Sequence, residues 1–178
     1  MLAQYPSNRK NTRPPILTRR EAIMLLTSLY ISLHVLAAVI WVGGMFFAYV
    51  CLRPVAATQL EPPARLRVWG GVFTRFFPLV WLAIVLLPLT GYAMLFAIWS
   101  NMAAAPLYVH LMNGFGTIMI LIYLYVYFAP FKRLKMAVAN QQWPDGAAAL
   151  SQIRQLIAVN MTLGIVVVLL ASAGRFIG

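Results

Sequence analysis

Two histidines are the residues of this sequence best suited to chemistry, because both fall inside long apolar stretches. His34 lies within the stretch 24–51, and His110 lies near the start of the stretch 107–129. An ionisable side chain at membrane depth needs a compensating partner or a metal, so it is a candidate functional residue. If both stretches cross the membrane in the same direction, the two imidazoles lie in the same leaflet. We therefore expect one shared site built on His34 and His110.

Three further side chains are expected near this site. At about 100° per residue, Trp41 shares a helical face with His34, and Asn113 lies at the margin of the face that carries His110. A small residue follows each histidine one turn deeper, which would leave room for a flat macrocycle between the helices. Arg175 ends the last apolar stretch on the same side, where a guanidinium pairs with a propionate or with a lipid phosphate.

The same residues are also compatible with a copper site. Nine methionines and two histidines suit a soft cation such as Cu(I). Met45 is eleven residues beyond His34, about 16 Å along a helix, so these two side chains cannot share one ion. Met94 and Met102 lie at the level of His110, which gives a predicted metal set of His34, His110, Met94 and Met102. A third reading keeps both histidines as structural residues that only form hydrogen bonds within the bundle.

The composition excludes several classes of protein. Apolar residues make up 62% of the chain, charged residues only 10%, and the mean hydropathy is +0.82, whereas a soluble domain has about 25% charged residues. The net charge of +11 comes from basic clusters that flank apolar runs, which is typical of anchoring to anionic lipid and not of nucleic-acid binding. A single cysteine, Cys51, excludes an intrachain disulfide. No paired carboxylates, nucleophile triad or phosphate loop occurs, so hydrolase, kinase and proton-pump functions are disfavoured.

Four apolar stretches are long enough to cross a bilayer, which takes about 20 residues each. They predict an all-α membrane protein, a four-helix antiparallel bundle in residues 24–178 preceded by a basic tail in residues 1–23. The predicted spans are 24–51, 76–99, 107–129 and 154–172. In the third connection, the segments on either side of the WPDG sequence have helical composition and are expected to lie along the lipid headgroups. Small residues are expected to let the helices approach closely: Gly43, Gly44, Ala48, Gly114, Gly116, Gly164 and Ala171.

The charges of the connections bear on orientation. Connections one and three carry eight basic residues, against six on the side of the two termini, and the second connection carries no charge. If translation began at Met24, the comparison would become eight against one. By the positive-inside rule we expect the basic connections in the cytoplasm and the termini in the periplasm.

Several motifs resemble a known family. SLHVLAAVIWVGGMFFAYVCLRP and LEPPARLRVWGGVFTRFFPLVW, then PLYVHLMNGFG and a closing ASAGRF, resemble the copper-resistance D (CopD) domain family of bacterial inner-membrane proteins. The resemblance covers nearly everything after residue 24. It implies copper homeostasis, with uptake or transfer of copper through the histidine site and a periplasmic copper or redox protein as partner. A homo-oligomer also remains open.

The layout is also similar, more distantly, to the HemJ-type protoporphyrinogen oxidases. That resemblance matches His34 and His110 to the family's histidines and implies heme b. The family's functional lysine corresponds to Met112 here, which argues against oxidase activity while leaving heme ligation open. The cofactor is therefore a copper ion or heme b. A membrane subunit with a structural or assembly role and no site is the remaining alternative.

Overall fold

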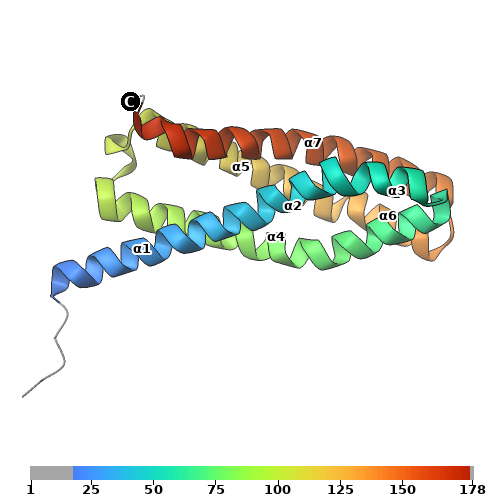
Figure 1. Ribbon diagram of the computed structural model, residues 1–178, viewed down its shortest axis with the longest axis horizontal. Helices are drawn as coiled ribbons and strands as arrows, with labels where there is room; N and C mark the ends of the chain where they lie inside the picture. Colours follow the sequence, from blue (N-terminus) through green and yellow to red (C-terminus); the bar gives the residue numbers. More distant parts are fainter. Residues whose placement is uncertain (1–17, 177–178) are drawn as a thin grey trace, which may run out of the picture.

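The computed structural model describes residues 18–176, and within them it is built of helices. Four helical units are long and apolar enough to cross a membrane: Arg19–Gln59, Pro62–Trp99, Leu107–Ala139 and Trp143–Ala173. They form an elongated bundle in which successive units run in opposite directions (Figure 1). The expected all-α four-helix membrane bundle is confirmed.

The first unit is not a uniform α-helix. It begins with α1 (Arg19–Ala38), which starts inside the segment expected to be a tail. Thr18 and Glu21 form a capping box there, in which each side chain accepts from the other residue's backbone N–H. The unit continues through the π-helical η1 (Val39–Gly43), α2 (Gly44–Phe46), the π-helical η2 (Phe47–Leu52) and α3 (Arg53–Gln59).

The other three units are more regular. α4 (Pro62–Trp99) is one helix that runs through Pro78 and Pro88, and it is followed by the 3-10 turn η3 (Met102–Ala104). The third unit consists of α5 (Leu107–Phe128) and α6 (Pro130–Ala139), which meet at Ala129. The fourth is α7 (Trp143–Ala173), and the short η4 (Gly174–Phe176) follows it.

The basic connections are more helical than expected. Only Leu60 and Glu61 separate α3 from α4, so most of the first connection belongs to these helices. In the third connection the two predicted helical segments exist, as α6 and as the first turns of α7. They extend the bundle along its long axis (Figure 1), and they pack against each other. The two segments were expected to lie along the lipid headgroups, whereas in this structure they run along the long axis of the bundle (Figure 1).

The core is rich in aromatic side chains from α4, α5 and α6. Phe77 stacks on Phe73, with ring centroids 5.2 Å apart, and meets Phe131 edge to face at 4.7 Å. Tyr123 packs edge to face on Phe77, and its hydroxyl donates to the carbonyl oxygen of Phe77 at 3.0 Å. Such pairs contribute about 0.5–1.5 kcal/mol beyond the area that they bury. This cluster therefore ties α4, α5 and α6 together.

Two of the expected close approaches occur at glycines. A Cβ atom on Gly44 would collide with the ring of Phe76, and one on Gly164 would lie 2.8 Å from Val42 and 3.1 Å from Met119. The other glycines of the set, Gly43, Gly114 and Gly116, have open space at the Cβ position. The close contacts therefore join α2 to α4 and α7 to η1, and α5 makes none through its glycines.

Candidate functional site

His34 lies on α1, half-buried against α4. Its Nδ1 atom lies 2.8 Å from the Oγ1 atom of Thr90, a side chain that is 4% exposed. The hydroxyl of Thr90 donates in turn to the carbonyl oxygen of Leu86 at 2.6 Å. The imidazole is therefore held by a polar residue inside the apolar bundle.

This hydrogen-bond chain favours one tautomer of His34. A threonine hydroxyl has one hydrogen and two acceptor lone pairs. With that hydrogen directed at the carbonyl oxygen of Leu86, 2.6 Å away, Nδ1 of His34 is the donor to Thr90. The neutral ring then carries its free lone pair on Nε2, which is the form in which histidine binds a metal. An outer partner that orients the ring in this way is a usual feature of metal-ligating histidines.

Gly91 also lies close to the imidazole of His34. A Cβ atom at this position would lie 3.3 Å from Cε1 and 3.8 Å from Nδ1 of His34. The first of these distances is tighter than an ordinary contact, so a larger residue would press on the ring. Thr90 and Gly91 together set the position of the ring, one by a hydrogen bond and the other by the absence of a side chain.

The second histidine has a different environment. His110 is in the first turns of α5 and is exposed, and no hydrogen bond holds its ring in the described part of the chain. Asn113, one turn further, is also exposed and accepts a hydrogen bond of 3.2 Å from the hydroxyl of Tyr92 on α4. Asn113 therefore joins α5 to α4 next to His110.

The structure does not show the two histidines in contact. α1 packs on α4 and α5 packs on α7, so His34 and His110 lie on helices of different packed pairs. Within residues 18–176, no group of three or more His, Cys, Asp or Glu side chains could hold a metal ion. Met94 on α4 and Met102 in η3 are half-buried at the same end of the bundle as His110. The side chain of Arg175 lies outside the described residues.

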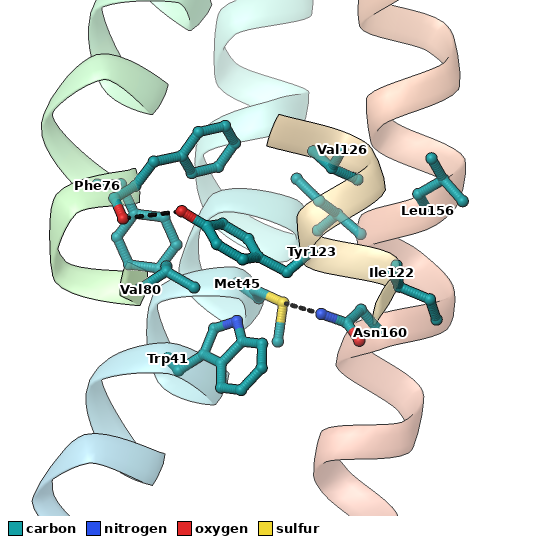
Figure 2. Close-up of a pocket in the computed structure, with 11 residues that line it drawn as sticks. Trp41, Met45, Phe76, Val80, Ile122, Tyr123, Val126, Leu156 and Asn160 are labelled. Atoms are coloured by element: carbon teal, nitrogen blue, oxygen red, sulfur yellow. Dashed lines mark hydrogen bonds between the residues drawn. The ribbon is translucent and has the colours of Figure 1, made fainter. Parts of the chain in front are cut away.

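Trp41 lies deeper and lines a different feature. It is 2% exposed and meets Tyr123 edge to face at 6.3 Å between ring centroids. Together with Met45, Asn160 and other residues, these rings line a cavity of about 20 Å³ (Figure 2), enough for about one water molecule. Trp41 shares the first helical unit with His34, but it lines this central cavity and is not one of the residues that hold the imidazole.

The heme alternative receives no support from this geometry. A second cavity, lined by Tyr49, Arg53 and Arg154 among others, has a volume of about 10 Å³. Neither histidine lines either cavity, and neither cavity could hold a macrocycle.

Sequence reasoning missed the polar residues that organise these sites. Thr90, Asn160 and Tyr123 all lie inside apolar helices, and the first two are the buried polar residues of the core. A rule that treats every polar residue within a membrane span as a candidate would have found Thr90 and Asn160. Their partners, His34 and Met45, depend on how the helices pack, which the spacing along one helix does not reveal.

Comparison with known proteins places the chain in a family. The family model described as copper resistance protein D (CopD) matches residues 70–173. The match includes Thr90, His110 and Asn160, and it lies beyond His34 and Trp41. No curated protein and no solved structure gives a significant match. Because the match spans more than half of the chain and four helices can cross a membrane, the chain is a multi-pass membrane protein that belongs to the copper resistance protein D family.

Proposed function

We propose that this protein handles copper in the bacterial inner membrane and that Nε2 of His34 is a ligand for Cu(I) in transit. Membership of the copper resistance protein D family supports the choice of metal. The observation that carries the proposal is the hydrogen bond between Nδ1 of His34 and Thr90, because Nε2 is the ligand atom of the tautomer in which Nδ1 donates to Thr90 and the hydroxyl donates to Leu86. Imidazole nitrogen is a suitable donor for copper.

His110 serves in this proposal as a more accessible ligand at the same end of the bundle. It lies three residues after the start of α5, about 5 Å along the helix, and its ring is exposed. Thr90 lies nine residues before the end of α4, about 14 Å from that end. Copper would therefore meet His110 first and His34 deeper in the bundle. The thioethers of Met94 and Met102 are additional soft donors at this end.

The uncharged second connection and the basic first and third connections support one orientation. The basic connections and their helices face the cytoplasm, and the end that carries both histidines faces the periplasm. A periplasmic copper or redox protein is then the partner that delivers or receives the ion at His110. Anionic lipids bind the basic end through its arginines and lysines.

Competition with a coloured Cu(I) chelator tests the proposal on purified protein in lipid nanodiscs. Wild type should bind Cu(I), His34→Ala should lower the affinity at least tenfold, and His110→Ala should slow loading more than it lowers affinity. Lys132→Ala, an exposed change at the basic end, should leave both unchanged. A correctly folded His34→Ala variant with wild-type affinity would overturn the proposal, and a Soret band in purified wild type would favour heme b instead.

A further inference from the structure

A second polar feature lies in the middle of the bundle, away from both histidines. Asn160 on α7 is 3% exposed, and its Oδ1 atom is a buried side-chain oxygen without a hydrogen-bond partner in the described structure. Buried polar groups in proteins are almost always satisfied. In a membrane span an unsatisfied polar group is still more costly, and it marks a candidate site.

The surroundings of Asn160 contain one soft donor and two aromatic rings. Its Nδ2 atom donates to Sδ of Met45 across 3.7 Å. Both side chains line the cavity of about 20 Å³, with Trp41 and Tyr123 on its wall. Figure 2 shows the amide and the thioether directed toward each other from α7 and α2, with the indole ring beside them. The cavity therefore has an oxygen, a sulfur and π faces around a space large enough for one small ion or molecule.

The backbone of the first helical unit is irregular on both sides of Met45. The π-helical segments η1 (Val39–Gly43) and η2 (Phe47–Leu52) flank the three residues of α2. π-helical turns occur frequently at functional sites, because each one rotates the side chains that follow it. Here they frame the segment that presents Met45 to Asn160, and η1 contains Trp41. The local helix geometry and the unsatisfied amide thus point to the same place.

We propose that Met45 and Asn160 form a transit site for Cu(I), deeper than His34 on the same route. This inference rests on the proposed function. A thioether is a soft ligand that selects Cu(I), and an ion in the cavity would also meet aromatic faces, which attract cations. All of these groups are neutral. A site made of neutral groups binds a cation weakly enough to release it, as conduction through successive sites requires.

The spacing of the two donors fits one ion. Turning the amide of Asn160 about its terminal torsion exchanges Oδ1 and Nδ2, and this torsion is broad and roughly two-fold. Oδ1 would then lie about as far from Sδ of Met45 as Nδ2 does now, 3.7 Å. With bonds of about 2.3 Å to sulfur and about 2.1 Å to oxygen, the lengths found at zinc sites, the angle at the ion is about 114°. The separation of the two atoms is therefore compatible with a shared ion.

The depth of Met45 in the bundle also fits a second binding site on the route of the ion. Met45 is eleven residues after His34 along the first helical unit, about 16 Å deeper at the usual helical rise. The two sites therefore cannot share one ion, and they can be occupied independently. A bound water that donates to Oδ1 of Asn160 is the alternative occupant of the cavity, and it would leave Met45 without a metal.

X-ray absorption at the copper edge distinguishes these occupants. Wild-type protein in nanodiscs is loaded with two equivalents of Cu(I), and the same is done with Met45→Leu and with Met136→Leu. Leucine conserves the volume of methionine, so both variants are expected to fold. Met136 is 50% exposed on α6 and provides the matched control.

Stronger sulfur scattering in wild type and in Met136→Leu than in Met45→Leu is the expected result, because Met94 and Met102 can supply sulfur only to the first equivalent. Asn160→Leu should lower the affinity for the second equivalent at least tenfold and leave the first unchanged. Sulfur scattering that is as strong in Met45→Leu as in Met136→Leu would overturn the transit site. Copper bound by nitrogen and oxygen alone in wild type would overturn it while leaving the His34 site intact, and a failure to bind copper at all would overturn both.

Discussion

The two ends of the bundle differ in how their side chains pack. We call α3, α6 and the first turns of α4 and α7 the basic half, and α1, the start of α5 and the last turns of α4 and α7 the terminal half. The core of the basic half contains large residues that are almost fully buried, with Phe73 at 1% exposure and Leu134 and Ile153 at 0%. In the terminal half large apolar side chains cover the outside, among them Leu89 and Leu169.

Helix length explains this difference. α4 has 38 residues, a length of about 57 Å, whereas the hydrocarbon core of a bilayer is about 30 Å thick. One end of the bundle must therefore project beyond the hydrocarbon. The basic half carries most of the charged residues of the described chain and packs an apolar core, as water-exposed structure does. The exposed apolar side chains of the terminal half suit contact with lipid, where apolar burial gives no drive for association and packing and a few polar contacts hold helices together.

The largest predicted effect is in the core of the basic half. Leu134→Ala removes a fully buried side chain and should lower the free energy of unfolding by about 2–5 kcal/mol. Leu169→Ala makes the same change at a position that is 61% exposed, and it should cost under about 1 kcal/mol because lipid replaces the lost contacts. Thermal unfolding in nanodiscs measures both. Equal losses would mean that the two halves do not differ in packing.

Glycine substitutions test the contacts where the halves meet. Gly164→Ala places a methyl group against Val42 and Met119, and the overpacking should cost about 1–3 kcal/mol. Gly114→Ala meets no atom within 4 Å and should be neutral or stabilising by up to about 1 kcal/mol, since alanine favours the helix. The same unfolding assay compares them. Destabilisation by Gly114→Ala would reveal a helix contact on the terminal half that this structure does not have.

The smallest predicted effects concern two tyrosine hydroxyls. Tyr123→Phe removes the buried bond to the carbonyl of Phe77 and should cost about 1 kcal/mol. Tyr92→Phe removes the exposed bond to Asn113, for which about 0.6 kcal/mol is the average between membrane helices. Unfolding curves of the two variants rank these contacts. A larger loss for Tyr92→Phe would show that the terminal half depends on this one polar contact.

Much of the fold could be predicted because hydropathy reports directly on membrane spans. All four spans exist, although α1 begins at Arg19 and α4 at Pro62, earlier than the apolar stretches do. The early starts were missed because charged residues such as Arg65 and Arg67 lower the hydropathy of turns that are nevertheless helical. Helical structure that projects beyond the hydrocarbon contains no long apolar run, so hydropathy does not predict it.

The site was less predictable because it depends on contacts between helices. Spacing singled out His34, but its partner Thr90 is 56 residues away in the chain, and only packing of α1 on α4 brings them together. The π-helical η1 and η2 also depart from the rotation of about 100° per residue of an α-helix. The direction of Met45 toward Asn160 therefore cannot be predicted from spacing along a uniform helix. The expectation that His34 and His110 share one site remains a prediction.

The bond between His34 and Thr90 is the contact on which this account of copper binding depends most. Thr90→Val removes the acceptor for Nδ1 while keeping the shape of the side chain, and Thr162→Val is the control, because Thr162 is exposed and its hydroxyl bonds only to the carbonyl of Ala158. Loss of such an outer partner typically weakens metal binding by about 10–100-fold. Chelator competition should show this loss of Cu(I) affinity for Thr90→Val and none for Thr162→Val. Wild-type affinity in a folded Thr90→Val variant would contradict the account.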